Sequence, residues 1–359
     1  YESQSDVAPA MAVAPGNNAF VVARMDGSLK TYPLKLLKSK PVETQQTVVV
    51  TTAKSETPRQ EFTEKEPNDT PSQALQITVP ANVKGTIDLA GDDRLEDQDL
   101  YRFTSKAGEQ WIVEVNAARS KSPLDSRIEV LTAEGERIER VIPEAVRDSY
   151  FTFRGKDSNT SNDYRVHNWR EMELNEYLYA DGEVVKLWLY PRGPDSGFKV
   201  YPGTGSRYAY FDTTPTTHAL NSPCYIVRPH APGTKLIPSG LPVFPIYYEN
   251  DDESRRELGS DSRLTFTAPA DGQYLVRVVD ARGFQGEKFA YTLTVRPRRP
   301  DFTVSVGGMN PKVSPGSGRE FSVKAKRKDG FQGPIHVHVK DLPKGFHVAT
   351  PLVIEAEQN

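Results

Sequence analysis

Several features that would assign this chain of 359 residues to a familiar class of protein are scarce. It contains one cysteine, Cys224, so no internal disulfide can form. No stretch approaches the roughly 18 apolar residues that cross a membrane, and we expect no membrane span. Lys and Arg total 45 against 48 Asp and Glu, which gives a net charge of −3. This near balance argues against a nucleic-acid-binding face, because such a face is strongly basic.

Recognisable catalytic motifs are missing as well. The sequence has no nucleophile elbow, no zinc-binding HExxH helix and no phosphate-binding loop. Its six histidines stand in no arrangement that indicates catalysis. Glu171, Glu173 and Glu176 resemble a glycosidase carboxylate pair only superficially, because their spacing fits a polar helix face equally well. We therefore predict that the chain is not an enzyme and has no catalytic residues.

What is abundant indicates a β protein. The hydrophobic fraction is 37%, and 28 prolines and 25 glycines provide many turns. Apolar and polar residues alternate at 100–103, 111–115 and 127–131, and again at 264–267, 275–278 and 291–295. Short alternating segments separated by turn residues are typical of an antiparallel β-sandwich. We predict a mostly β fold, with this sandwich as its centre.

The run Glu64-Lys65-Glu66-Pro67-Asn68-Asp69-Thr70 gathers three carboxylates and an amide just before the first of these segments. A second acidic cluster, between positions 92 and 99, leads into Asp99-Leu100-Tyr101-Arg102-Phe103. Oxygen ligands at this density suit Ca²⁺, and so many like charges are costly together without a cation. The alternative is that they are solvated loop acids. We expect the third acidic group, Asp251, Asp252 and Asp261, to be solvated turn residues.

These two runs, with the step Ser122-Pro123-Leu124-Asp125-Ser126, resemble the bacterial pre-peptidase C-terminal domain, a β-sandwich accessory module of exported proteins. In that family the two sets of strands are neighbours. The resemblance thus implies one jelly-roll-like sandwich formed by residues 64–136 and 249–299 and split by an insertion at 137–248. Calcium-binding relatives, notably the collagen-binding modules of clostridial collagenases, imply the following ligands: Glu64, Glu66, Asn68, Asp69, Glu96 and Asp99.

The remaining segments have their own patterns. Residues 1–37 predict a β-hairpin that resembles part of a WD40-type propeller blade or stands alone, and 38–63 predict a linker. Residues 300–359 resemble the first strands of an immunoglobulin-like domain and end before its closing strands. The insertion is rich in aromatic residues and predicts a small β subdomain with a short helix near 171–178. Aromatic residues in polar, Gly-rich surroundings are its candidate ligand-binding residues: Trp169, Tyr201, Tyr208 and Tyr210.

Together these patterns predict a non-catalytic accessory, adhesion or spacer module of an exported bacterial multidomain protein of planctomycete type, stabilised by Ca²⁺. We expect it outside the cell, at the cell surface or in the periplasm. Its partner would be an extracellular polymer, protein or polysaccharide, or neighbouring domains of the same chain. One alternative is a substrate-binding accessory region of a secreted protease or glycosidase whose catalytic domain lies outside this chain. Another is that the insertion binds carbohydrate.

Overall fold

The computed structural model describes residues 10–13, 19–23, 29–33, 57–88, 97–158, 162–193, 195–203, 206–307 and 312–359. The chain divides into two compact units, residues 1–57 and 58–359. In the first unit, three strands form an antiparallel sheet in chain order: β1 (Ala10–Val13), β2 (Ala19–Ala23) and β3 (Leu29–Pro33).

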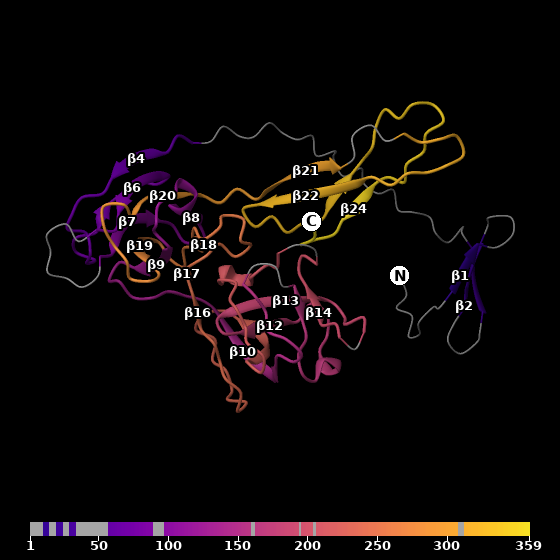
Figure 1. Ribbon diagram of the computed structural model, residues 1–359, viewed down its shortest axis with the longest axis horizontal. Helices are drawn as coiled ribbons and strands as arrows, with labels where there is room; N and C mark the ends of the chain where they lie inside the picture. Colours follow the sequence, from indigo (N-terminus) through magenta and orange to yellow (C-terminus); the bar gives the residue numbers. More distant parts are fainter. Residues whose placement is uncertain are drawn as a thin grey trace. The chain divides into compact units, whose positions relative to one another are not determined.

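The second unit contains a β-sandwich built from strands that precede and follow residues 137–248 in the sequence (Figure 1). One described sheet has the order β17-β9-β19-β7-β5 and the other the order β18-β8-β20-β6-β4. The first four strands of each sheet come alternately from after and before the insertion; β7, for example, pairs with β19 over seven residue pairs. The strands are β4 (Gln60–Thr63), β5 (Leu75–Gln76), β6 (Ala81–Thr86), β7 (Asp99–Ser105), β8 (Gln110–Asn116), β9 (Ser126–Thr132), β17 (Glu249–Asn250), β18 (Arg263–Thr267), β19 (Gly272–Asp280) and β20 (Ala290–Pro297).

The sandwich core is formed by the inward-facing residues of both sheets. Alternate positions of β20, namely Tyr291, Leu293 and Val295, are buried, as a period of two requires. Phe103 of β7 and Phe266 of β18 meet edge to face across the core, with ring centroids 6.1 Å apart. Such pairs stabilise a core by about 0.5–1.5 kcal/mol beyond their buried area. The mostly β sandwich predicted from the sequence is confirmed.

Two strand pairs differ from a purely antiparallel sandwich. The edge strands β4 and β5 run parallel to β6 and β7, respectively. β4 begins at Gln60, inside the segment predicted to be a linker, so that the sandwich starts four residues earlier than expected. A polar edge strand such as Gln60-Glu61-Phe62-Thr63 is hard to recognise from sequence, because only Phe62 contacts the core.

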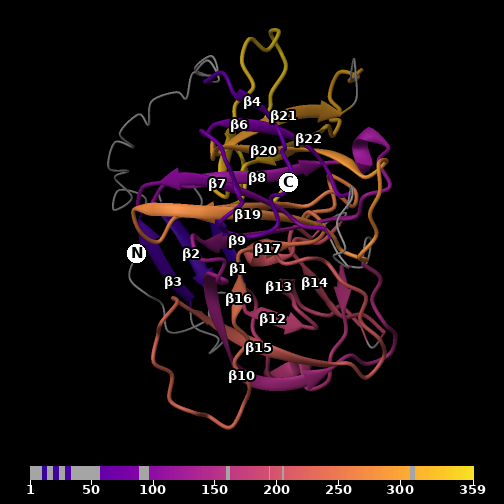
Figure 2. The same ribbon diagram turned by 90° about the vertical axis from the view of Figure 1, so that its left-hand side faces the viewer.

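The insertion forms a separate seven-stranded sheet, in the order β11-β14-β13-β12-β15-β10-β16 among the described strands (Figure 2). Its own core includes Phe151, Tyr164 and Phe198. The helix expected near 171–178 is wrong: a three-residue 3-10 helix, η3 (Trp169–Glu171), precedes a strand. The strands are β10 (Glu139–Tyr150), β11 (Asp163–Tyr164), β12 (Tyr177–Ala180), β13 (Glu183–Leu189), β14 (Phe198–Val200), β15 (Pro223–His230) and β16 (Ile246–Tyr247), with a further 3-10 turn, η4 (Tyr210–Asp212).

The C-terminal part consists of two antiparallel hairpins. β21 (Asp301–Gly307) pairs with β22 (Ser322–Lys328), and β23 (Ile335–Val337) pairs with β24 (Leu352–Ile354). The last residues dock on the insertion, where the Glu357 carboxylate lies 2.7 Å from the Lys186 ammonium. None of the helices in the described ranges is both long and apolar enough to span a bilayer.

Candidate metal centre

The acidic run and the start of β7 meet at one edge of the sandwich. The run at 64–69 follows β4 directly, and backbone contacts hold it against the residues that open β7. The Leu100 amide donates to the Asn68 carbonyl at 3.2 Å, and the Gln98 side-chain amide donates to the Asp69 carbonyl at 2.8 Å. Four residues where the two segments meet are at most 5% exposed: Asn68, Asp69, Asp97 and Asp99.

Carboxylate oxygens converge here in two overlapping sets. Glu64, Glu66 and Asp99 form one set, and Glu66, Asp69 and Asp97 form the other; within each set one oxygen from every residue lies within 4.8 Å of the others. Glu66 belongs to both sets. With Asn68 between them, six oxygen-bearing side chains surround one region, which we call the acidic centre. Six to eight oxygens are what Ca²⁺ coordinates.

Asn68 gives the acidic centre its most informative atom. Its side-chain amide nitrogen donates to Asp99 Oδ1 at 2.8 Å, which fixes the orientation of the amide group. Its oxygen, Oδ1, is buried and has no hydrogen-bond partner among the described residues. A buried acceptor without a partner costs about 1–3 kcal/mol. An oxygen left free among carboxylates is explained if it coordinates a cation.

Two tyrosines and a glycine support the acidic centre from the core side. The Tyr291 hydroxyl donates to Asp99 Oδ2 and lies 2.6 Å from the Tyr101 hydroxyl. Glu64 accepts the Thr86 amide at 2.9 Å. Gly85, the residue before it, is required here, because a Cβ at this position would lie 2.5 Å from both Glu64 Oε2 and the Tyr291 ring.

The electrostatics of the metal-free centre are unfavourable. Burial raises the pKa of Asp97 to about 7, and the neighbouring charges of Glu66 and Asp69 add to the effect. Burial, followed by the charge of Glu64, raises the pKa of Asp99 well above its usual range. Burial also raises the pKa of Glu64. Without a cation, burial and mutual repulsion disfavour the ionised forms of these carboxylates, and a bound divalent cation would offset that penalty.

Five of the six predicted ligands, Glu64, Glu66, Asn68, Asp69 and Asp99, thus meet at one place. The sixth, Glu96, lies outside the described residues. Asp97 was overlooked, although a signal for it exists in the sequence. Asp97 and Asp99 are two residues apart at the start of a strand, and side chains at that spacing share a face.

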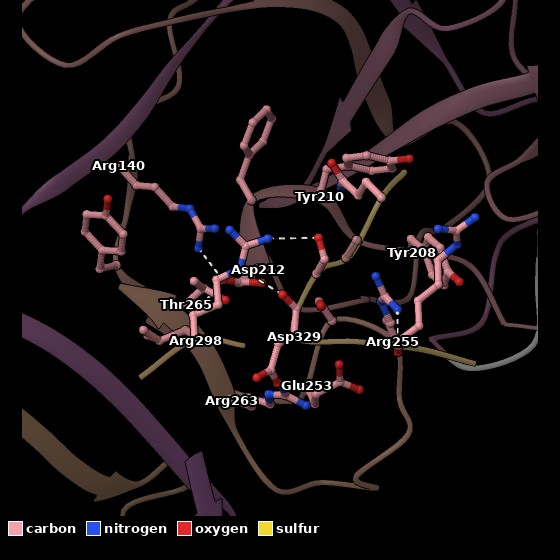
Figure 3. Close-up of a pocket in the computed structure, with 18 of the residues that line it drawn as sticks. Arg140, Tyr208, Tyr210, Asp212, Glu253, Arg255, Arg263, Thr265, Arg298 and Asp329 are labelled. Atoms are coloured by element: carbon pink, nitrogen blue, oxygen red, sulfur yellow. Dashed lines mark hydrogen bonds and ion pairs between the residues drawn. The ribbon is translucent and has the colours of Figure 1, made fainter. Parts of the chain in front are cut away.

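The predicted ligand-binding aromatics do not form one exposed surface. Tyr208 and Tyr210 are more than nine-tenths buried, in a cluster with Val141, Val184 and Ile246. Both line a cavity of about 350 Å³, which we call the junction cavity, between the sandwich, the insertion and the C-terminal hairpins (Figure 3). Tyr201 packs beside this cluster and donates from its hydroxyl to Asn175 at 2.7 Å.

Trp169 lies elsewhere, against the core of the insertion near Phe198. It lines an open groove with Phe153 and His167. Phe153 is 55% exposed and has a φ of 76°, a conformation that is a genuine outlier for a bulky residue. Strained residues of this kind cluster at ligand sites.

The third acidic group is not solvated, contrary to expectation. Asp261 is fully buried and accepts hydrogen bonds from the amides of Ala117 and Ala118 at 2.9 and 2.7 Å. It also pairs with Arg119 at 2.6 Å. Asp251 is half-buried, and burial followed by the charges of Asp252 and Asp125 raises its pKa to about 6. Asp261 therefore helps to anchor the chain where it re-enters the sandwich.

A buried polar cluster inside the insertion was also overlooked. Glu183 and Arg207 are each 1% exposed and form a two-pronged ion pair, at 2.5 and 3.0 Å. His218, equally buried, lies with Nε2 2.7 Å from Glu183. Burial would raise the pKa of Glu183, but the hydrogen bonds from His218 and Arg207 outweigh it and lower that pKa. The cluster is buried inside the insertion and is structural in character.

Comparison with known proteins adds no family assignment: no protein-family model matches the chain, and no curated protein is detectably similar to it in sequence.

Proposed function

We propose that this chain is a non-catalytic, calcium-stabilised accessory module of an exported bacterial protein, acting as an adhesion or spacer element. The observation that carries the proposal is the acidic centre, where six oxygen-bearing side chains converge around the unpartnered Asn68 Oδ1. The resemblance to pre-peptidase C-terminal domains supports the same reading, and it is the sole basis for an extracellular location.

The role of the cation follows from where its ligands lie in the chain. Glu64, Glu66, Asn68 and Asp69 follow the edge strand β4, which pairs with β6 over only four residues. Asp97 and Asp99 open β7, which lies inside the other sheet of the sandwich. A cation held by both groups would fasten the entering chain to the sandwich and join its two sheets at this edge. A module fixed in this way transmits force or holds a neighbouring domain at a defined position.

A thermal melt in excess Ca²⁺ and in chelator tests the proposal. A ligand that binds only the folded state at a hundredfold excess over its Kd stabilises it by about 2.7 kcal/mol. We expect that Ca²⁺ raises the Tm and that Glu66→Gln abolishes the increase. Glu134→Gln removes the same charge at an exposed turn and should leave the increase intact. Identical melts with Ca²⁺ and chelator would reject the calcium role.

A second candidate function rests on the groove of Trp169. An exposed aromatic residue held in a strained conformation beside Trp169 suits the stacking of a sugar ring. We propose carbohydrate binding by the insertion as the alternative, to be tested by a glycan array. Phe153→Gly removes both the ring and the strain, so we expect binding to be lost while stability changes by less than about 1 kcal/mol. Retained glycan binding in this variant would exclude the groove.

A further inference from the structure

One segment of the insertion projects from its sheet and exposes apolar side chains. Residues 231–243, which we call the apolar arm, connect β15 to β16, and Figure 1 and Figure 2 both show this segment projecting from the insertion. Ile237, in the middle of the arm, is 87% exposed, more than any other large hydrophobic residue in the described ranges. Leu236, Leu241 and Val243 are partly or largely exposed beside it. A group of exposed apolar residues of this kind marks an interaction site.

The base of the apolar arm is firmly held, because β10 binds the chain on both sides of it. β15 pairs with β10 up to the residue before the arm. Where the arm returns, the Ala145 amide donates to the Pro242 carbonyl at 3.0 Å, and the Phe244 amide donates to the Pro143 carbonyl at 2.9 Å. The Phe244 ring stacks on Tyr179, with ring centroids 3.8 Å apart. The exposure of the arm is therefore built into the fold.

The charge carried by the apolar arm is entirely positive. Lys235 is its one charged residue, and it contains no carboxylate. Arg228, exposed on β15, adds a second cation just before the arm. Glu144, opposite Arg228 in the strand register, has its carboxylate 2.9 Å from His230 Nε2. An apolar surface with cations at its border suits a partner that is apolar inside and anionic outside.

The residue types of the apolar arm distinguish between classes of partner. Protein-binding hot spots are enriched in Trp, Tyr and Arg, and Leu, Ser and Val are under-represented in them. The arm consists mainly of Leu, Ile, Val, Pro and other small residues, and it contains no aromatic residue and no Arg. It also has no ring on which a sugar could stack. This composition favours a lipid surface over a protein or a polysaccharide.

The backbone of the apolar arm suits the same environment. Backbone N–H groups without a partner are costly among lipids. Pro232, Pro238 and Pro242 have no N–H, and the Leu241 amide donates to the Ser239 hydroxyl oxygen at 3.3 Å. Four of the thirteen positions therefore bring no unsatisfied amide into a lipid interface.

We propose that the apolar arm docks the chain on a lipid surface. Ile237, with Leu236 and Leu241, enters the boundary between the headgroups and the acyl chains, where interfacial segments lie about 5–10 Å deep. The Lys235 ammonium contacts anionic headgroups at the border of the inserted part. This lipid contact goes beyond the proposed spacer role and does not depend on it, since the arm shares no residue with the acidic centre.

Co-sedimentation of the full chain with vesicles tests the proposal. The vesicles consist of phosphatidylcholine, either alone or mixed in equal parts with phosphatidylglycerol, and we expect binding to both and tighter binding to the mixed vesicles. Ile237→Ser should lower the partition coefficient about tenfold on both, or about 1.4 kcal/mol. Lys235→Gln should lower it about fivefold on the mixed vesicles alone, or about 1 kcal/mol. Val306→Ser, which removes an apolar side chain 63% exposed on β21, is the matched control and should change nothing.

A fluorescent label makes the test independent of the size of the binding defect. Cys224 is buried, so an environment-sensitive dye should react only with a new surface cysteine. We expect that vesicles shift the emission of a dye on Ile237→Cys to shorter wavelength and leave a dye on Val306→Cys unchanged. No sedimentation with either vesicle, an equal loss in Val306→Ser, or an unshifted dye at position 237 would each overturn the proposal.

Self-association of the parent that Ile237→Ser abolishes, without any vesicle binding, would overturn it as well and assign the arm to a second copy of the chain. None of these outcomes bears on the calcium proposal, which depends on the thermal melts.

Discussion

Substituting Asp97 by Asn should stabilise the metal-free protein clearly and the calcium-bound protein much less. In the metal-free protein, the pKa of Asp97 is raised from 3.8 to about 7, by burial first and then by Glu66 and Asp69. At about 1.4 kcal/mol per pKa unit, the ionised carboxylate costs up to about 4 kcal/mol at pH 8. Asn has no charge to bury, and its side-chain oxygen can still accept the Asp88 amide, which Asp97 accepts at 2.5 Å. In chelator at pH 8, Asp97→Asn should therefore be more stable than the parent.

Excess Ca²⁺ should reduce this advantage from up to about 4 kcal/mol to about 1 kcal/mol, because the variant lacks one anionic ligand. The parent gains about 2.7 kcal/mol at a hundredfold excess of Ca²⁺ over its Kd, and the variant gains little. Urea unfolding of the parent and of the variant, each in Ca²⁺ and in chelator, measures the four free energies of unfolding that this comparison needs. If Asp97→Asn is less stable than the parent in chelator, the carboxylate is not under electrostatic strain and the reasoning fails.

The pH dependence of the metal-free parent provides an independent check of the sign. The folded state holds a proton on Asp97 up to about pH 7, whereas the unfolded chain releases it near 3.8. The contribution of this group to stability is therefore full below pH 3.8 and is lost as the pH rises to about 7. Ca²⁺ binding needs the ionised form, so the benefit from Ca²⁺ should instead grow with pH over the same range.

Three further substitutions test other parts of the structure by urea unfolding. Glu183→Gln leaves the buried Arg207 without its counter-ion and should lower the free energy of unfolding by about 3–5 kcal/mol. Glu171→Gln, at an exposed ion pair, should lower it by less than about 1 kcal/mol. Equal losses in the two variants would contradict this expectation. Gly85→Ala should destabilise the protein by about 1–3 kcal/mol and abolish the stabilisation by Ca²⁺, since the added methyl would collide with Glu64 and Tyr291. Normal stabilisation by Ca²⁺ would show that the acidic centre does not need a glycine at this position. Asp251→Asn should stabilise the protein by up to about 3 kcal/mol at pH 8 and have little effect at pH 4, because the raised pKa of about 6 disfavours the ionised carboxylate. Stabilisation at both pH values would refute an electrostatic cause.

The parts of the fold that were predictable are those in which side chains alternate around a thick core. β20 shows a period of two with large apolar residues, and β8 is a largely buried apolar strand; both were expected from the sequence. β4 was missed, since an edge strand buries little and its residues are mainly polar. The segment at 171–178 was misread as a helix. Leu178 and Ala180 are buried on one face of β12, a strand that lies between β13 and β15, and its pairing with β15 is a long-range contact that local pattern cannot reveal.

The candidate site shows a similar division. Glu64, Glu66, Asn68 and Asp69 lie within six residues, so that a ligand-rich segment was visible without any knowledge of the fold. The parts that turn it into a buried centre come from far away in the chain: Tyr291 lies 192 residues from the Asp99 carboxylate that it supports. The junction cavity was still less accessible to sequence reasoning, as its arginines come from four separate segments. Tyr208 and Tyr210 were selected for their polar neighbours in sequence, yet their actual neighbours are apolar core residues and arginines.

The acidic centre lies where separate segments of the chain must be held together, and this has a thermodynamic consequence. It joins the entering chain to the sandwich. A ligand that contacts several segments binds only when all are in place, so its binding energy opposes their separation. Buried like charges weaken the empty acidic centre locally. If the chain is a calcium-stabilised spacer, as proposed above, it is stiff where Ca²⁺ is abundant and loosens where Ca²⁺ is scarce.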